Sequence, residues 1–169
     1  MQEILKNDFN DNLTEEVVSS VRLKGELTDE IRDKKASTSN IVDQGHNMIV
    51  LGCHNLIAGL VGGIANSSEQ LYFAIGNSNK EVSAGDDALD NFLFKIPIKQ
   101  QDITINNNIL SITVEFPDVA PDGIDDAVYN TIWRECAIFK GDNMLNRKIH
   151  SDIEKTQDII LSRTFKFTF

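Results

Sequence analysis

Three histidines and two cysteines are the residues of this 169-residue chain most suited to binding a metal or acting as nucleophiles. Cys53 and His54 are adjacent, so on a helix their side chains would point about 100° apart and would not share one ion. His46 and His54 are separated by roughly two helical turns, too far for ligands at bond lengths of about 2 Å. The carboxylate of Glu135 would raise the thiol pKa of neighbouring Cys136 rather than lower it. We therefore predict packing roles, with no catalytic or metal-binding residue among them.

Two acidic clusters are the other candidates for chemistry. One lies in the segment 77–91, the other in the segment 117–126, and their aspartates are Asp86, Asp87 and Asp90, and Asp118, Asp122, Asp125 and Asp126. Their spacing does not match the D-x-[DN]-x-[DN]-G calcium loop, and the sequence contains no glycine-rich phosphate loop, G-x-S-x-G or H-E-x-x-H motif. We predict solvated loops, no enzyme activity and no cofactor. Whether either loop binds an ion or a receptor stays open.

Composition narrows the classes of partner. The formal net charge is -10, and a nucleic-acid partner would require clustered Lys and Arg that the chain lacks. The two cysteines form no C-x-x-C pair, and the start MQEILKNDFNDN lacks the features of a secretory leader. No apolar run reaches the ~20 residues that span a bilayer. We expect free buried thiols, synthesis in a reducing cytosol, and neither a nucleic-acid nor a membrane partner.

The segment 43–63 is the longest with apolar residues at helical spacing. It predicts the one principal helix, with Asn40 or Asp43 as the N-cap and Gly62-Gly63 at the C-terminal end. Glycines seven residues apart, at 45, 52 and 59, would lie along one line of that helix and allow a close approach. We expect the helix to pack on a sheet.

The rest of the chain is typical of β-structure. Gly25 to Asp33 is predicted as a half-exposed strand, followed by a loop at 34–40. Further strands are expected at 71–76, 92–98, 103–116 (a hairpin turning at Asn106 to Asn108), 131–140, 144–150 and 159–169. Pro97 favours an edge position for its strand. About seven strands and one helix predict a mainly β (α+β) fold, an antiparallel β-sandwich or curled sheet with the helix packed on it.

The N-terminal segment 1–24 is predicted to be an arm or a short amphipathic helix outside the β-rich domain, which spans 25–169. Its apolar residues recur at helical spacing over a narrow face, and they are Leu13, Val17, Val18 and Val21. We expect this face to order against the body or a neighbouring subunit; a solvated tail is the alternative.

Short motifs follow one another in a fixed order through the second half of the chain. They are Ile75-Gly76, Ile132 with Glu135 and Phe139, Leu145 with Arg147, Ile153 with Lys155-Thr156, and Phe169. In this order they resemble a family of small tailed-bacteriophage virion structural proteins. The resemblance implies a non-enzymatic building block of the tail, baseplate, neck, fibre attachment or capsid surface. Its expected location is the virion, after synthesis in the host cytoplasm.

The expected partners are therefore other virion proteins and copies of this chain in a symmetric homo-oligomer. Position in the particle, copy number and partner identity are left open. The alternative function is a receptor- or carbohydrate-binding β-sandwich module. Such a module needs an exposed aromatic platform; Trp133 is expected to point into a strand, and Tyr72 and Tyr129 are isolated in the sequence.

Overall fold

The computed structural model describes residues 23–65 and 68–169. The predicted arm therefore lies almost wholly outside the described residues, and Lys24, which we had assigned to it, begins the first strand. None of the helices in the described ranges has the length and apolar character needed to cross a bilayer.

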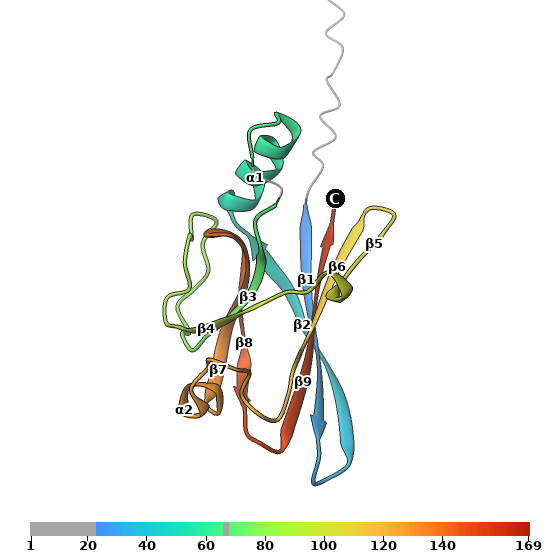
Figure 1. Ribbon diagram of the computed structural model, residues 1–169, viewed down its shortest axis with the longest axis vertical. Helices are drawn as coiled ribbons and strands as arrows, with labels where there is room; N and C mark the ends of the chain where they lie inside the picture. Colours follow the sequence, from blue (N-terminus) through green and yellow to red (C-terminus); the bar gives the residue numbers. More distant parts are fainter. Residues whose placement is uncertain (1–22, 66–67) are drawn as a thin grey trace, which may run out of the picture.

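The described chain folds into one nine-stranded sheet with a principal helix at one end (Figure 1). The elements are β1 (Lys24–Asp33), β2 (Thr38–Ile49), α1 (Leu51–Val61), β3 (Leu71–Gly76), β4 (Phe92–Pro97), η1 (Gln100–Asp102), β5 (Ile103–Asn106), β6 (Ile109–Phe116), α2 (Asp126–Tyr129), β7 (Ile132–Lys140), β8 (Asn143–Glu154) and β9 (Ile159–Thr168). The strand order is β4-β3-β7-β8-β2-β1-β9-β6-β5, and the pairs are antiparallel. The predicted curled sheet is confirmed.

The sheet curls so that its two halves face one another across an aromatic core. Phe73 of β3 packs edge-on against Phe116 of β6, with ring centroids 5.3 Å apart, and lies 5.4 Å from Phe165 of β9. Phe94 and Trp133 extend the cluster, with centroids 5.5 Å apart. Such pairs add roughly 0.5–1.5 kcal/mol beyond the area they bury. These aromatic contacts hold the inner faces of the two halves of the curled sheet together.

Strand alternation explains which side chains enter this core. Leu161, Arg163, Phe165 and Phe167 of β9 are buried, whereas the residues that alternate with them are more exposed, as the predicted period of two requires. The hairpin of β5 and β6 turns at Asn107 and Asn108, as predicted. β4, which contains Pro97, lies at the edge of the sheet, and this prediction is also confirmed.

The predicted helix 43–63 is wrong in its first half. Residues up to Ile49 belong to β2, and the N-cap is Val50 rather than Asn40 or Asp43. Antiparallel pairing with β1 over nine residue pairs overrides the local helical spacing. Gly45 lies at the irregularity in that ladder with φ of 73°, which suits glycine. The helix ends at Gly62 in a right-handed conformation, and Gly63 takes the positive φ.

The predicted line of glycines is therefore broken, because Gly45 lies in a strand. Gly52 does allow a close approach: a Cβ there would lie 2.4 Å from the backbone oxygen of Met144 in β8. α1 packs on the sheet through this contact and through Cys53, Leu56 and Ile57, so the expected packing is observed over the shorter helix.

Two other boundaries differ from the sequence prediction. The strand expected at 144–150 runs on to Glu154 as β8, and the loop expected at 34–40 ends at Ser37, where β2 begins. The sheet has nine strands rather than about seven, chiefly because β2 was not anticipated.

Candidate functional site

The polar centre of the molecule is an ion pair between Glu135 of β7 and Arg147 of β8. Both side chains are buried, and Arg147 donates from Nη2 and Nε to Glu135 Oε2 over 2.7 and 3.0 Å. Arg147 Nη1 also donates to Asp86 Oδ2 over 2.8 Å. The two strands are antiparallel neighbours, and an irregularity between Trp133 and Glu135 interrupts their ladder next to the carboxylate.

The same carboxylate holds the ends of the loop 77–91. Glu135 accepts backbone N–H groups from Ser78 and Asn91 on Oε1, over 3.3 and 2.8 Å, and from Asp90 on Oε2 over 3.3 Å. Charge-assisted bonds of this kind are stronger than those between neutral groups. Glu135 therefore fastens both ends of this loop to the sheet, while Arg147 holds its middle through Asp86.

A second buried ion pair joins β1 to β9. Arg163 donates to both oxygens of Asp29, from Nε over 2.6 Å and from Nη2 over 2.7 Å. Its third nitrogen, Nη1, lies 3.1 Å from His150 Nε2, while His150 Nδ1 lies 2.8 Å from the carbonyl of Ser151. This geometry assigns a neutral imidazole that accepts at Nε2 and donates at Nδ1. Burial, followed by the charge of Arg163, lowers the His150 pKa to about 2.

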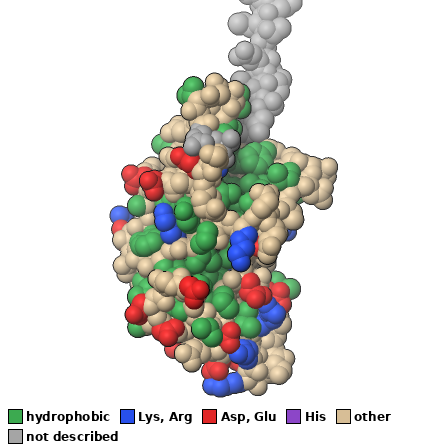
Figure 2. Space-filling view, in the orientation of Figure 1, with side chains coloured by type: hydrophobic (Ala, Val, Ile, Leu, Met, Phe, Trp, Pro, Cys, Tyr) green, Lys and Arg blue, Asp and Glu red, His purple; other side chains and the backbone are tan. Residues whose placement is uncertain are grey.

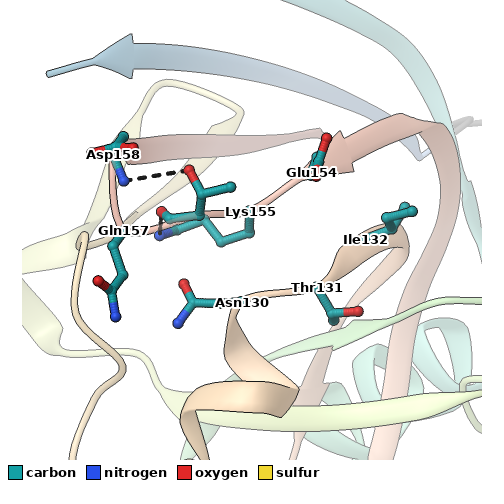
Figure 3. Close-up of a pocket in the computed structure, with 8 residues that line it drawn as sticks. Asn130, Thr131, Ile132, Glu154, Lys155, Gln157 and Asp158 are labelled. Carbon is teal, nitrogen blue, oxygen red and sulfur yellow. Dashed lines mark hydrogen bonds between the residues drawn. The ribbon is translucent and has the colours of Figure 1, made fainter. Parts of the chain in front are cut away.

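A cavity of about 530 Å³ lies between the end of α2 and the bend that joins β8 to β9 (Figure 3). Asn130 points into it from one side, and Gln157 and Asp158 line the other. Lys155 lines it too but is itself buried: its Nζ lies 4.6 Å from the ring centroid of Tyr129 and donates to the carbonyl of Thr156. Burial lowers the Lys155 pKa to about 8, opposed by the charge of Asp118.

The cysteines and histidines singled out in the sequence occupy different surroundings. Cys53 and Cys136 are free and buried, as predicted, and burial raises the pKa of the Cys53 thiol to about 11 and that of Cys136 to about 12. His46 and His54 come from β2 and α1, yet they line one cleft. Among the described residues, no three His, Cys, Asp or Glu side chains are grouped as a metal site.

The acidic loops use several of their carboxylates within the protein. Asp86 pairs with Arg147, Asp90 with Lys80, and Asp118 with Lys34. Asp125 caps α2 by accepting the N–H groups of Ala127 and Val128. The predicted loops are observed, and several of their carboxylates stabilise the fold through ion pairs and a helix cap.

Tyr129 and Trp133, two of the aromatic residues considered in the sequence, pack against each other in the core. Tyr129 is not isolated: it is buried, its ring centroid lies 5.5 Å from that of Trp133, and its hydroxyl donates to the carbonyl of Pro117. Trp133 is buried, as expected for its strand position. Neither ring is available to a ligand at the surface.

The two buried ion pairs were missed by the sequence prediction, although a signal existed. Arg163 shares the parity of Leu161 and Phe165, and Asp29 shares that of Leu27. When each of two strands has a charged residue among the side chains that face the core, the two residues are expected to form a buried ion pair. The partner of each residue could not be identified without the strand register.

Exposed apolar side chains gather at one end of the long axis. This end carries the C-terminal end of α1, the β5–β6 turn and the C-terminus (Figure 1). Figure 2 shows hydrophobic surface between the helix and the hairpin. The exposed hydrophobic residues of these segments are Leu60, Val61, Ile64, Ile105, Ile109 and Phe169. We call this set the apolar end.

Comparison of the chain with models of known protein families, with curated proteins and with solved structures finds no match.

Proposed function

We propose that this chain is a non-enzymatic structural component of a bacteriophage virion, which docks into a symmetric assembly at the tail, baseplate, neck or capsid surface. The observation that carries the proposal is the apolar end, where Val61 and Ile64 are 86% and 87% exposed. Large apolar side chains gathered on one surface mark interaction sites. Docking of this end on another virion protein, or on another copy, would bury them.

The use of the buried charges supports the same proposal. Glu135, Arg147, Asp29 and Arg163 are paired with one another, so these groups serve to fix strands and a loop rather than to face a substrate. Gly76, Glu135 and Arg147, three of the positions that carry the resemblance to phage virion proteins, meet at this cluster. A motif that maintains the fold is what a structural protein requires.

The test is to locate the chain in particles. A short tag inserted between Ala36 and Ser37, in the β1–β2 turn opposite the apolar end (Figure 1), leaves that end free. We expect gold-labelled antibody to mark a fixed position on particles purified from cells that express the tagged chain. Tagged protein that remains entirely in the unassembled fraction would contradict the proposal.

A pair of substitutions tests the docking surface itself. Replacing Val61 and Ile64 by Asp places charges where burial is proposed, so incorporation should fall while the far-ultraviolet circular dichroism of the purified chain stays unchanged. Ile41→Asp is the matched control, because Ile41 is also exposed but lies near the β1–β2 turn. Equal incorporation of both variants would show that the apolar end is not the docking surface.

The alternative, a receptor- or carbohydrate-binding module, is favoured by one observation. A cavity of about 420 Å³ beside β4 is lined by the exposed ring of Phe92, by Phe139 and by the charged groups of Asp87, Lys95 and Asp142. An apolar surface beside charged groups is a setting in which a sugar ring can bind. Saturable binding on a glycan array that disappears in Phe92→Ala would favour this function; an array without binding would favour the structural one.

A further inference from the structure

β1 and β2 separate at the end of the sheet that carries α1 (Figure 1). A cleft lies at this separation. The last pair of their ladder is Gly25 with Asn47. Beyond it, β2 turns to pair with β8 through Met48 and Ile49, whereas β1 stays paired with β9. The cleft between them measures about 290 Å³ and is bordered by α1 through His54.

Asn47 lies where the two strands part, and its side-chain amide is unpaired. The residue is 8% exposed, and neither Oδ1 nor Nδ2 has a hydrogen-bond partner among the described residues. The amide lies against Gly25, where a Cβ would come within 1.9 Å of Oδ1. Leaving a buried polar group unpaired costs about 1–3 kcal/mol. An amide offers one donor group and one acceptor, which is the complement of a peptide group.

The walls of the cleft define what it would bind. Leu23, Met48 and Ile49 supply apolar surface, and Lys24, His46 and His54 supply basic side chains. No Asp or Glu occurs among the described residues that line it, although the chain carries a net charge of -10. The other four cavities described along this surface each include an aspartate. The cleft therefore suits a peptide that is apolar and acidic.

One segment of this chain has that composition. Residues 13–21 read LTEEVVSSV, in which Glu15 and Glu16 accompany the apolar residues Leu13, Val17, Val18 and Val21. This segment precedes Leu23, which forms part of the cleft wall. Only Arg22 separates Val21 from Leu23, whereas the tightest chain reversals use two residues, so the segment of a neighbouring copy suits the cleft better than the segment of the same chain. Val18, at the middle of the segment, is five residues from Leu23 and reaches at most about 18 Å from it when extended, so the neighbouring copy has to pack directly against this end of the sheet.

We propose that the cleft at Asn47 binds residues 13–21 of a neighbouring copy of this chain. The amide of Asn47 then pairs with a peptide group of the incoming segment, and its two glutamates lie near Lys24 and the histidines. The inference rests on the proposed function, because it assigns one contact of the symmetric assembly.

The test is disulfide formation between two full-length chains, one carrying Val18→Cys and the other Met48→Cys with a tag in the β1–β2 turn. Cys53 and Cys136 are buried and stay out of the reaction. We expect mild oxidation to link the two chains about tenfold faster than it links Val18→Cys to a Ser39→Cys control, because docking raises the effective concentration of the pair. Linkage no faster than the control would overturn the proposal. The proposal would also be overturned if a single chain carrying both cysteines formed the disulfide within itself at high dilution, because the cleft would then bind the segment of its own chain.

Asn47→Leu supplies an independent readout. Because the amide is unpaired in the isolated chain, the midpoint of denaturant unfolding should stay the same or rise, while linkage slows about tenfold. A lower midpoint would show that the amide is already paired within one copy and would overturn the proposal. Both measurements use purified protein, so their results do not depend on the gold labelling of particles. If the chains link but are absent from particles, the virion function alone is refuted. If particles are labelled but the chains do not link, this contact alone is refuted.

Discussion

Glu135 and Arg147 face each other from neighbouring strands with Oε2 and Nη2 2.7 Å apart, and both side chains are buried. Removing the charge of Glu135 leaves the buried Arg147 with Asp86, at the edge of the site, as its remaining counter-ion. We therefore expect Glu135→Gln to lower the free energy of unfolding by about 3–5 kcal/mol. Amide exchange in the loop 77–91 should accelerate as well, since Ser78 and Asn91 donate to this carboxylate. Denaturant unfolding and hydrogen exchange measure the two effects.

The control is Arg134→Gln in the same strand. Arg134 pairs with Asp152 over 3.0 Å at a site where the aspartate is more than half exposed, so its loss should cost no more than about 1 kcal/mol. A Glu135→Gln chain as stable as this control would mean that the buried pair contributes little.

His150 should make the protein sensitive to acid. Its pKa is lowered to about 2 in the folded chain, from an ordinary value near 6.5, by burial and by Arg163. Between these values the unfolded chain binds the extra proton, so stability is complete above pH 6.5 and falls as the pH decreases below it. The expected slope is about 1.4 kcal/mol per pH unit. In His150→Gln, which keeps an acceptor for Arg163, the profile from pH 7 to 4.5 should be flatter; identical profiles would refute the assignment.

Lys155 should make the stability of the protein depend on pH in the alkaline range. Burial lowers its pKa to about 8 from 10.5, against the charge of Asp118. Between pH 8 and 10.5 the unfolded chain holds the proton that the folded chain has released, so this group makes stability rise with pH. Relative to Lys155→Met, the original chain should gain on the order of 2 kcal/mol from pH 7.5 to 9.5. A constant difference between the two chains in urea melts over this range would contradict the expectation.

Gly52 tests how α1 packs on β8. A Cβ at this position would lie 2.4 Å from the Met144 carbonyl oxygen, so Gly52→Ala forces the helix away from the strand and should cost about 1–3 kcal/mol. Gly62→Ala, where the nearest atom is 3.3 Å away and the backbone is right-handed, should change stability by less than about 1 kcal/mol. If both variants melt at the same temperature, the close contact between helix and strand is absent in solution.

Much of the sheet could be predicted because its signals are local. Alternation in β9 and β6, the asparagine turn of the hairpin and the edge position of Pro97 each depend on a few neighbouring residues. Burial of the two cysteines followed from their apolar surroundings. Each of these predictions is confirmed.

The remaining features depend on contacts distant in sequence. Asp43 to Ile49 has helical spacing, but pairing with β1 makes it a strand. The role of Glu135 depends on Arg147 and on the two ends of a loop more than forty residues away, at Ser78 and Asn91. The unpaired amide of Asn47 is visible only once β1 and β2 are seen to separate.

The ladder between β2 and β8 has a mechanical consequence. β2 joins the two halves of the sheet, but it pairs with β8 through only two described residues, Met48 and Ile49, whereas it pairs with β1 over nine. Under a pulling force across the sheet, this short ladder is the weakest backbone connection between the halves. Its rupture would leave them joined by the packing of the aromatic core, while each half keeps its own strands paired. The chain would then yield in two steps, at a low and a high load.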